Sequence, residues 1–225
     1  MQDARYVREA FAGIARRYVL TNHVLSMGTD VLWRRKTARL VASFTPSHVL
    51  DLATGSGDLA IAIQNACPNA QVLGADFSVP MMRQAQRQHF QNLIAADAMA
   101  LPFADGSFDV VTVAFGLRNM ASWPGALKEM HRVLRSGGHL VVLDFSLPAF
   151  PLMRGPYLFY LKHLMPKIAG LLTGKREAYE YLCGSIERFP SGARMESLMR
   201  ECSFAGPVSR PLSFGIATLY SATRL

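Results

Sequence analysis

Apolar and polar residues follow two periods between residues 47 and 146. Short apolar runs that end near glycine or aspartate are typical of buried strands, and they predict strands at 48–53, 70–75, 93–95, 108–115 and 139–144. Helical spacing between these runs predicts helices at 59–65, 80–89 and 123–134. Strands that alternate with helices favour right-handed crossovers and a mostly parallel sheet covered on both faces. The predicted fold class is therefore α/β, doubly wound.

The segments on either side of this core have helical periodicity. Residues 1–46 predict a helical arm, residues 147–206 a helical insertion that opens with several prolines, and residues 207–225 two closing strands. Helices of the insertion are expected at 157–165, 176–186 and 193–202, and the strands are joined around 213–215. Because nothing resembles a flexible linker, we expect a single domain over residues 1–225, with its core at 47–146.

Charge is distributed unevenly along the chain. The formal net charge of +8 divides into +5 over residues 1–48, −2 over 49–149 and +5 over 150–225. Basic flanks can attract nucleic acid, anionic lipid headgroups or a polyanionic ligand, and they can also serve solubility alone. We therefore expect any anionic partner to meet the flanks rather than the central segment.

Composition excludes several classes of protein. A chain with 50% hydrophobic and 18% charged residues can bury a core, which excludes a disordered protein. The longest uncharged stretch, residues 59–75, is interrupted by Pro68 and polar residues, so no transmembrane helix is expected. The N-terminus has no apolar stretch typical of a signal peptide, which predicts a cytoplasmic protein. Cys67, Cys183 and Cys202 form no C-x-x-C pair, so we expect reduced packing thiols and no metal site.

The most informative turn runs from Asp51 to Ala60 and contains Gly55 and Gly57. Glycines after a strand allow a sharp turn and a close approach of backbone to a ligand, and the helix N-terminus that follows favours negative charge. On its own the pattern fits NAD, another nucleoside or simply a tight turn.

Three carboxylates narrow the choice of ligand. Asp76 ends the second strand, where a carboxylate can accept both hydrogen bonds of a ribose diol. Asp51 precedes the glycines, where it can receive an ammonium group and would repel a pyrophosphate. Asp97 follows the third strand and can accept from an adenine amino group. A ligand with an amino acid, a ribose and an adenine is S-adenosylmethionine.

Together with Phe108 to Val111 and Arg132 to Gly138, these blocks resemble the ordered motifs of class I S-adenosylmethionine-dependent methyltransferases. The block Phe115 to Asn119, Phe-Gly-Leu-Arg-Asn, more narrowly resembles the ubiquinone/menaquinone-biosynthesis C-methyltransferase family, and so do parts of 18–35 and 181–190. The resemblance implies a Rossmann-like fold and a cofactor-binding set of Tyr18, Asp51, Thr54, Gly55, Ser56, Gly57, Asp76, Phe77, Asp97, Ala98 and Ala114. Two positions depart from the family pattern: Val19 stands where aspartate is usual, and Asp30 where histidine is usual.

The resemblance implies methylation of a ring carbon in demethylmenaquinol or a related polyprenylated benzoquinol. Such a carbon becomes nucleophilic when a neighbouring hydroxyl loses its proton. Arg118 is expected to stabilise the phenolate and hold a water that takes the proton, and Asn119 to fix the second quinol oxygen. His163 is the histidine to test as an auxiliary base.

The isoprenoid tail implies peripheral contact with the inner membrane face. Apolar residues of 157–165 beside Lys162 and Lys167 can line a groove and touch headgroups, or form an ordinary packing helix. A homodimer is also permitted by the resemblance.

Other functions stay open at this point. A methyltransferase for another small molecule would keep the cofactor residues but give Arg118 and Asn119 no special importance. A nucleic-acid methyltransferase is disfavoured because the chain has no Asn/Asp-Pro-Pro-aromatic block and no basic stripe interleaved with aromatics. A non-enzymatic binding module would leave the cofactor-shaped turn unexplained.

Overall fold

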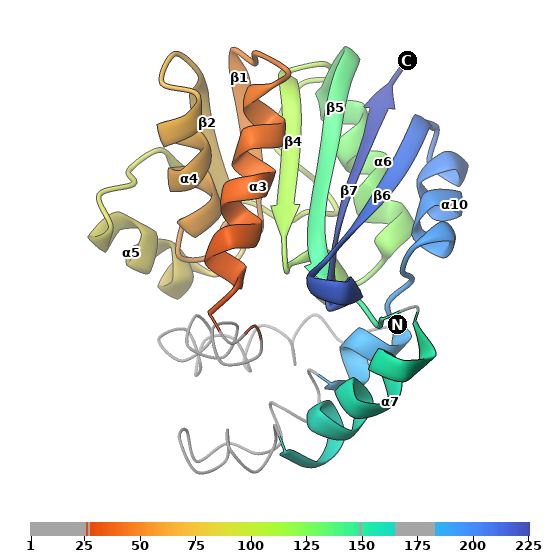
Figure 1. The fold of residues 1–225 in the computed structure, drawn as a ribbon. Coiled ribbons are helices and arrows are strands. Elements are labelled where there is room, and N and C mark those ends of the chain that lie inside the picture. Colours follow the sequence, from red (N-terminus) through yellow and green to blue (C-terminus); the bar gives the residue numbers. More distant parts are fainter. Residues whose placement is uncertain (1–25, 27, 149, 165–182) are drawn as a thin grey trace.

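A computed structural model describes residues 26, 28–148, 150–164 and 183–225. Its centre is a seven-stranded sheet of order β3-β2-β1-β4-β5-β7-β6, in which β1 to β5 are parallel and β7 runs antiparallel to both of its neighbours (Figure 1). The strands are β1 (His48–Leu52), β2 (Gln71–Asp76), β3 (Leu93–Ala95), β4 (Phe108–Ala114), β5 (Leu134–Phe145), β6 (Phe204–Leu212) and β7 (Ala217–Arg224). The predicted α/β class with a mostly parallel sheet is confirmed.

Helices cover both faces of the sheet (Figure 1). The helices are α3 (Asp30–Ala42), α4 (Asp58–Ala66), α5 (Val79–Arg87), α6 (Trp123–Val133), α7 (Pro151–Phe159) and α10 (Ala193–Glu201). Three shorter elements are the 3₁₀ turns η1 (Leu117–Asn119) and η3 (Ser213–Gly215) and the π-helical segment η2 (Tyr160–Leu164). No helix in the described ranges is both long and apolar enough to span a bilayer.

Alternation along the strands divides the core into two layers. Val49 and Val110 point to the face covered by α3 and α4, where Trp33 and Ile63 are buried with them. Leu50 and Val111 point to the opposite face, which is covered by α6 and α10. Both faces of the parallel strands are therefore buried, as their continuous apolar runs predict.

Two predicted boundaries were wrong because glycine and proline were taken as breaks. β5 begins at Leu134, before the Gly137-Gly138 pair, rather than at His139. The pairing of β4 with β5 shifts register near these glycines, so they lie at an irregularity within a long strand. α7 begins at Pro151 because proline suits a first helical position, and Pro156 lies inside it. Most of the helix expected at 176–186 lies outside the described residues.

The chain leaves the sheet in opposite directions from its two central strands. β1 leads through α4 to β2, whereas β4 leads through α6 to β5 on its other side. A crevice at such a switch point, at the carboxyl ends of the strands, is where ligands bind in open α/β sheets. α7 lies beyond this same edge, below the sheet in Figure 1.

Candidate functional site

The turns that follow β1 and β4 meet at the switch point. Gly55 and Gly57 have φ of +58° and +82°, and Gly57 caps α4 in the left-handed conformation. A Cβ on Gly116, in the turn after β4, would lie 2.5 Å from the Cβ of Ala53. Ala53 and Phe115 both have positive φ although neither is glycine. Backbone strain of this kind is concentrated at ligand sites, and here it occurs in both turns.

Asp51 is buried at this edge, and no cation of the described residues is bonded to it. Its carboxylate accepts hydrogen bonds from the hydroxyls of Thr54 at 2.7 Å and Thr112 at 2.6 Å. Burial raises the pKa of Asp51 to about 6, although the two hydroxyls and the charge of Arg34 oppose the shift. A fully buried carboxylate held only by neutral donors is a suitable acceptor for a ligand ammonium group.

Asp76 ties the end of β2 to the glycine turn. One carboxylate oxygen accepts the N–H of Gly55 at 2.8 Å, and the other accepts the N–H of Ser78 at 2.8 Å. Burial raises the pKa of Asp76, and these N–H groups lower it. Each oxygen can accept a second hydrogen bond, so the carboxylate is fixed in place and can still receive a ribose diol.

A cavity lies over the glycine turn. Its lining includes the predicted residues Asp51, Thr54, Gly55, Ser56 and Ala114. Residues that were not in the predicted set also line it: Arg34, Ala53, Asp58, Leu59, Met81 and Phe115. The structure therefore brings together residues from α3, β1, α4, α5 and the end of β4.

Other predicted cofactor residues lie outside this lining. Asp97 is exposed after β3, where it accepts the N–H of Met99 at 2.9 Å, with Ala98 beside it. Phe77 follows Asp76 and is 40% exposed. Because β3 pairs with β2, these residues extend the same edge of the sheet away from Asp51. Tyr18 and Val19 lie outside the described residues.

Arg118 differs from its predicted setting because it is completely buried and paired within the protein. Its Nη1 donates to Asp144 at 2.6 Å and to the carbonyl of Phe115 at 2.7 Å. Burial raises the pKa of Asp144, and the adjacent guanidinium opposes that shift. Asp144 ends β5 and was not predicted as a partner, since nothing local in the sequence indicates a contact 26 residues away.

Two buried oxygens beside this pair have no hydrogen-bond partner among the described residues. They are Oδ1 of Asn119 in η1 and the hydroxyl of Tyr157 in α7. Burial raises the pKa of the Tyr157 phenol, while the charge of Arg118 lowers it, which places the phenol within electrostatic range of Arg118. Unsatisfied buried polar groups are uncommon in folded proteins and often mark a place where a ligand binds.

Several residues singled out from the sequence lie elsewhere. His163 is exposed in η2 with its ring 5.0 Å from that of Phe159. Cys67, Cys183 and Cys202 are free, buried thiols, as predicted. Asp30 is fully buried in α3, where it pairs with Arg34 and accepts from the hydroxyl of Ser26 at 2.8 Å. The spacing of Asp30 and Arg34, four residues apart on one helix, was the available signal for this pair.

Comparison with known proteins identifies relatives over nearly the whole chain. A model of the ubiE/COQ5 methyltransferase family matches residues 1–224. A demethylmenaquinone methyltransferase of Thermus thermophilus is 42% identical over 222 residues, which cover 95% of this chain and 99% of the relative. The ubiquinone/menaquinone biosynthesis C-methyltransferase UbiE of Syntrophotalea carbinolica is 40% identical over 222 residues, covering 96% and 93%.

Solved structures agree on the fold. A methyltransferase of Thermotoga maritima superposes with a TM-score of 0.68 at 18% identity, covering 97% of this chain and 100% of its own. Human N-acetylserotonin methyltransferase in complex with S-adenosylmethionine gives a TM-score of 0.62 at 17% identity, covering 97% and 59%. At these identities the likeness shows the fold, and it supports the Rossmann-like methyltransferase architecture expected from the motifs.

Proposed function

The chain belongs to the ubiE/COQ5 methyltransferase family, and from this premise we propose that it methylates a ring carbon of a polyprenylated quinol with S-adenosylmethionine. The names of its relatives favour demethylmenaquinol as the acceptor and menaquinol as the product, with the related benzoquinol as the second candidate. The structural observation that supports an acceptor next to Arg118 is Oδ1 of Asn119, which is buried and has no hydrogen-bond partner in the described part of the chain.

The described residues fit the cofactor. When bound, S-adenosylmethionine supplies a methyl group carried by a positively charged sulfur. Asp51 would hold the ammonium of its amino-acid end, and Asp76 the ribose hydroxyls. Asp97, further along the edge, would accept from the adenine amino group. Thr54, Gly55, Ser56 and Ala114 line the cavity together with Asp51. Gly57, Phe77, Ala98 and Tyr18 complete the proposed set.

Arg118 and Asn119 have different proposed tasks at the acceptor. A ring carbon is nucleophilic only after a neighbouring hydroxyl loses its proton, and positive potential favours the resulting phenolate. Because Asp144 offsets much of the guanidinium charge, Arg118 contributes partly by charge and partly by fixing the turn that carries Asn119. The partnerless Oδ1 of Asn119 accepts a hydrogen bond from the remaining quinol hydroxyl.

We also propose that α7 and η2 contact the bilayer that holds the isoprenoid tail. This segment carries exposed apolar side chains at Phe150, Leu152, Phe159 and Leu164. Arg154 is exposed among them, and a cation near the surface attracts anionic headgroups. The segment lies beyond the carboxyl ends of the strands, where the acceptor must enter (Figure 1).

The test is methyl transfer from labelled S-adenosylmethionine to chemically reduced demethylmenaquinone, with the oxidised quinone in a parallel reaction. Label should enter the reduced acceptor only, because the quinone has no hydroxyl to ionise. Label in neither acceptor, despite binding of S-adenosylhomocysteine, would favour a methyltransferase for another small molecule.

An Asn119→Ala variant tests the acceptor site separately. We expect a lower rate on the quinol with unchanged binding of S-adenosylhomocysteine. Asn69→Ala, in an exposed turn before β2, is the matched control and should leave both measurements unchanged. Equal rates for both variants would remove Asn119 from the proposed acceptor site.

A further inference from the structure

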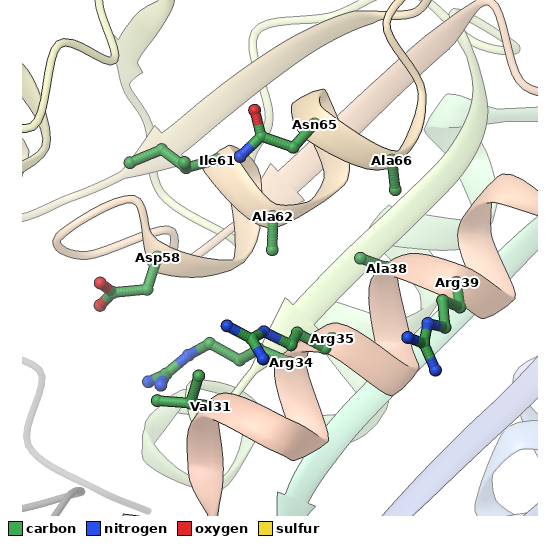
Figure 2. A pocket seen from close by; sticks show the side chains of 10 residues that line it. All are labelled: Val31, Arg34, Arg35, Ala38, Arg39, Asp58, Ile61, Ala62, Asn65 and Ala66. Atoms are coloured by element: carbon green, nitrogen blue, oxygen red, sulfur yellow. The ribbon is translucent and has the colours of Figure 1, made fainter.

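Arg34 lines two neighbouring cavities. One is the cavity over the glycine turn. The other is a groove of about 410 Å³ between α3 and α4, which Arg35, Arg39 and Asn65 also line (Figure 2). Arg35 and Arg39 are exposed, whereas Arg34 is only 8% exposed. Among the three arginines of α3, Arg34 is therefore the one that is built into the cofactor cavity.

The cavity over the glycine turn is lined by both acidic and basic side chains. In the described part of the chain its lining contains two carboxylates, Asp51 and Asp58, and one cation, Arg34. The charge of Arg34 lowers the pKa of Asp51, so the two groups lie within electrostatic range. The amino-acid end of S-adenosylmethionine carries an ammonium and a carboxylate on the same carbon. A site that binds both needs an anion and a cation close together, and Asp51 and Arg34 supply them.

Contacts with the protein fix the guanidinium. Its Nη1 pairs with Asp30, whose side chain is completely buried and is held in turn by Ser26. The guanidinium carbon lies 5.3 Å from the ring centroid of Phe115, in the turn after β4. Guanidinium has five N–H donors, so pairing through Nη1 leaves donors on its other nitrogens. The group is thus both positioned and able to donate.

We propose that Arg34 binds the carboxylate of the methionine moiety of S-adenosylmethionine, with Asp30 as its positioning residue. The proposal deepens the proposed function and rests on the cofactor assigned there. Backbone N–H groups at the start of α4 are the competing donors for this carboxylate. Charge-assisted bonds from a pre-positioned guanidinium are about twice as strong as neutral ones, which favours Arg34.

The test compares two ligands that differ only in this carboxylate. Isothermal titration calorimetry measures S-adenosylhomocysteine and its decarboxylated analogue, S-adenosyl-3-thiopropylamine, against the intact protein. The wild type should bind the carboxylated ligand about 10- to 100-fold more tightly, the range expected of one charged hydrogen-bonding partner. Arg34→Gln should abolish that preference while leaving affinity for the decarboxylated ligand unchanged. Arg35→Gln, which changes the exposed neighbour, should retain the preference.

Binding needs no acceptor, so this result does not depend on which quinol is methylated. Equal affinity of the wild type for both ligands would overturn the proposal. So would an Arg34→Gln variant that loses both ligands in the same proportion, since that is the behaviour of a structural residue. If Arg34→Gln does not fold, Arg34→Lys should show an intermediate preference, because lysine keeps the charge but lacks the planar set of N–H donors. An undiminished preference in that variant would contradict the role of those donors.

Discussion

Two fully buried aspartates end parallel strands on either side of β4, and their partners differ. Asp51, at the end of β1, is held by two hydroxyls. Asp144, at the end of β5, is held by the guanidinium of Arg118. Within the described ranges, the first carboxylate has hydrogen bonds but no bonded cation, whereas an arginine compensates the charge of the second. Asp51 is therefore suited to bind a positively charged group of a ligand, whereas Asp144 stabilises the fold, although both lie at the same edge of the sheet.

The largest expected effect concerns the ion pair of Asp144 with Arg118. Asp144→Asn removes the anion and leaves the guanidinium of Arg118 buried without its counter-charge. Breaking a buried ion pair in this way typically costs about 3–5 kcal/mol, so the free energy of unfolding in urea should fall by that amount. A double variant, Arg118→Met with Asp144→Leu, should recover most of the stability while losing quinol methylation. A single variant as stable as the wild type would contradict the comparison.

Asp51→Asn should weaken ligand binding without lowering stability, in contrast to Asp144→Asn. The amide has nearly the same size as the carboxylate and can still form hydrogen bonds, but it has no charge to pair with an ammonium. S-adenosylhomocysteine should therefore bind about 10- to 100-fold more weakly by calorimetry. Stability without ligand should not decrease, because a costly buried charge is removed. Substantial destabilisation would show that Asp51 is a structural group like Asp144.

Binding of S-adenosylhomocysteine should strengthen as pH rises through the pKa of Asp51, which is about 6. Ionised Asp51 is the form that pairs with the ammonium, and its population increases about tenfold between pH 5 and pH 7. The stability of the ligand-free protein should change in the other direction. The folded state binds the proton of Asp51 more tightly than the unfolded chain does. The contribution of Asp51 to the free energy of unfolding therefore falls as pH rises from 3.8 to about 6. Asp51→Asn is the control that should remove this part of both pH dependences.

The smallest expected effect is that of Tyr157→Phe. Its hydroxyl is buried and has no partner among the residues that the structure describes, so its removal should raise the free energy of unfolding by roughly 1 kcal/mol. If the same hydroxyl contacts the acceptor beside Asn119, KM for the quinol should rise while affinity for S-adenosylhomocysteine stays constant. A stability gain with unchanged KM would make Tyr157 a packing residue of α7.

The sequence predicted those parts of the site that depend on local patterns. The strand ends and the glycine turn predicted that Asp51, Thr54 and Gly55 lie close together, and the structure shows them lining one cavity. Partners far away in the chain were beyond such reasoning. Thr112 bonds Asp51 across 61 positions, because β1 and β4 are neighbours only in the folded sheet.

Two further differences have the same cause. Arg118 was predicted to stabilise the phenolate, and its pairing with Asp144 was not predicted, because no local pattern indicates a partner 26 residues away. The start of α7 was missed because the predicted helix began at residue 157, after the prolines, although proline is favourable in the first turn of a helix. Arg34 lies in the segment 18–35 that resembles the family, but its burial depends on how α3 packs against the sheet.

The contact between Gly116 and Ala53 constrains how such enzymes can diversify. A methyl group at position 116 would overlap that of Ala53, so the loop that faces the acceptor and the loop that faces the cofactor share one small volume. A graft that brings in the acceptor loop of another methyltransferase would therefore need a matched change after β1. A new acceptor specificity that depends on the turn after β4 therefore has to keep a residue without a side chain at position 116 or change Ala53 at the same time.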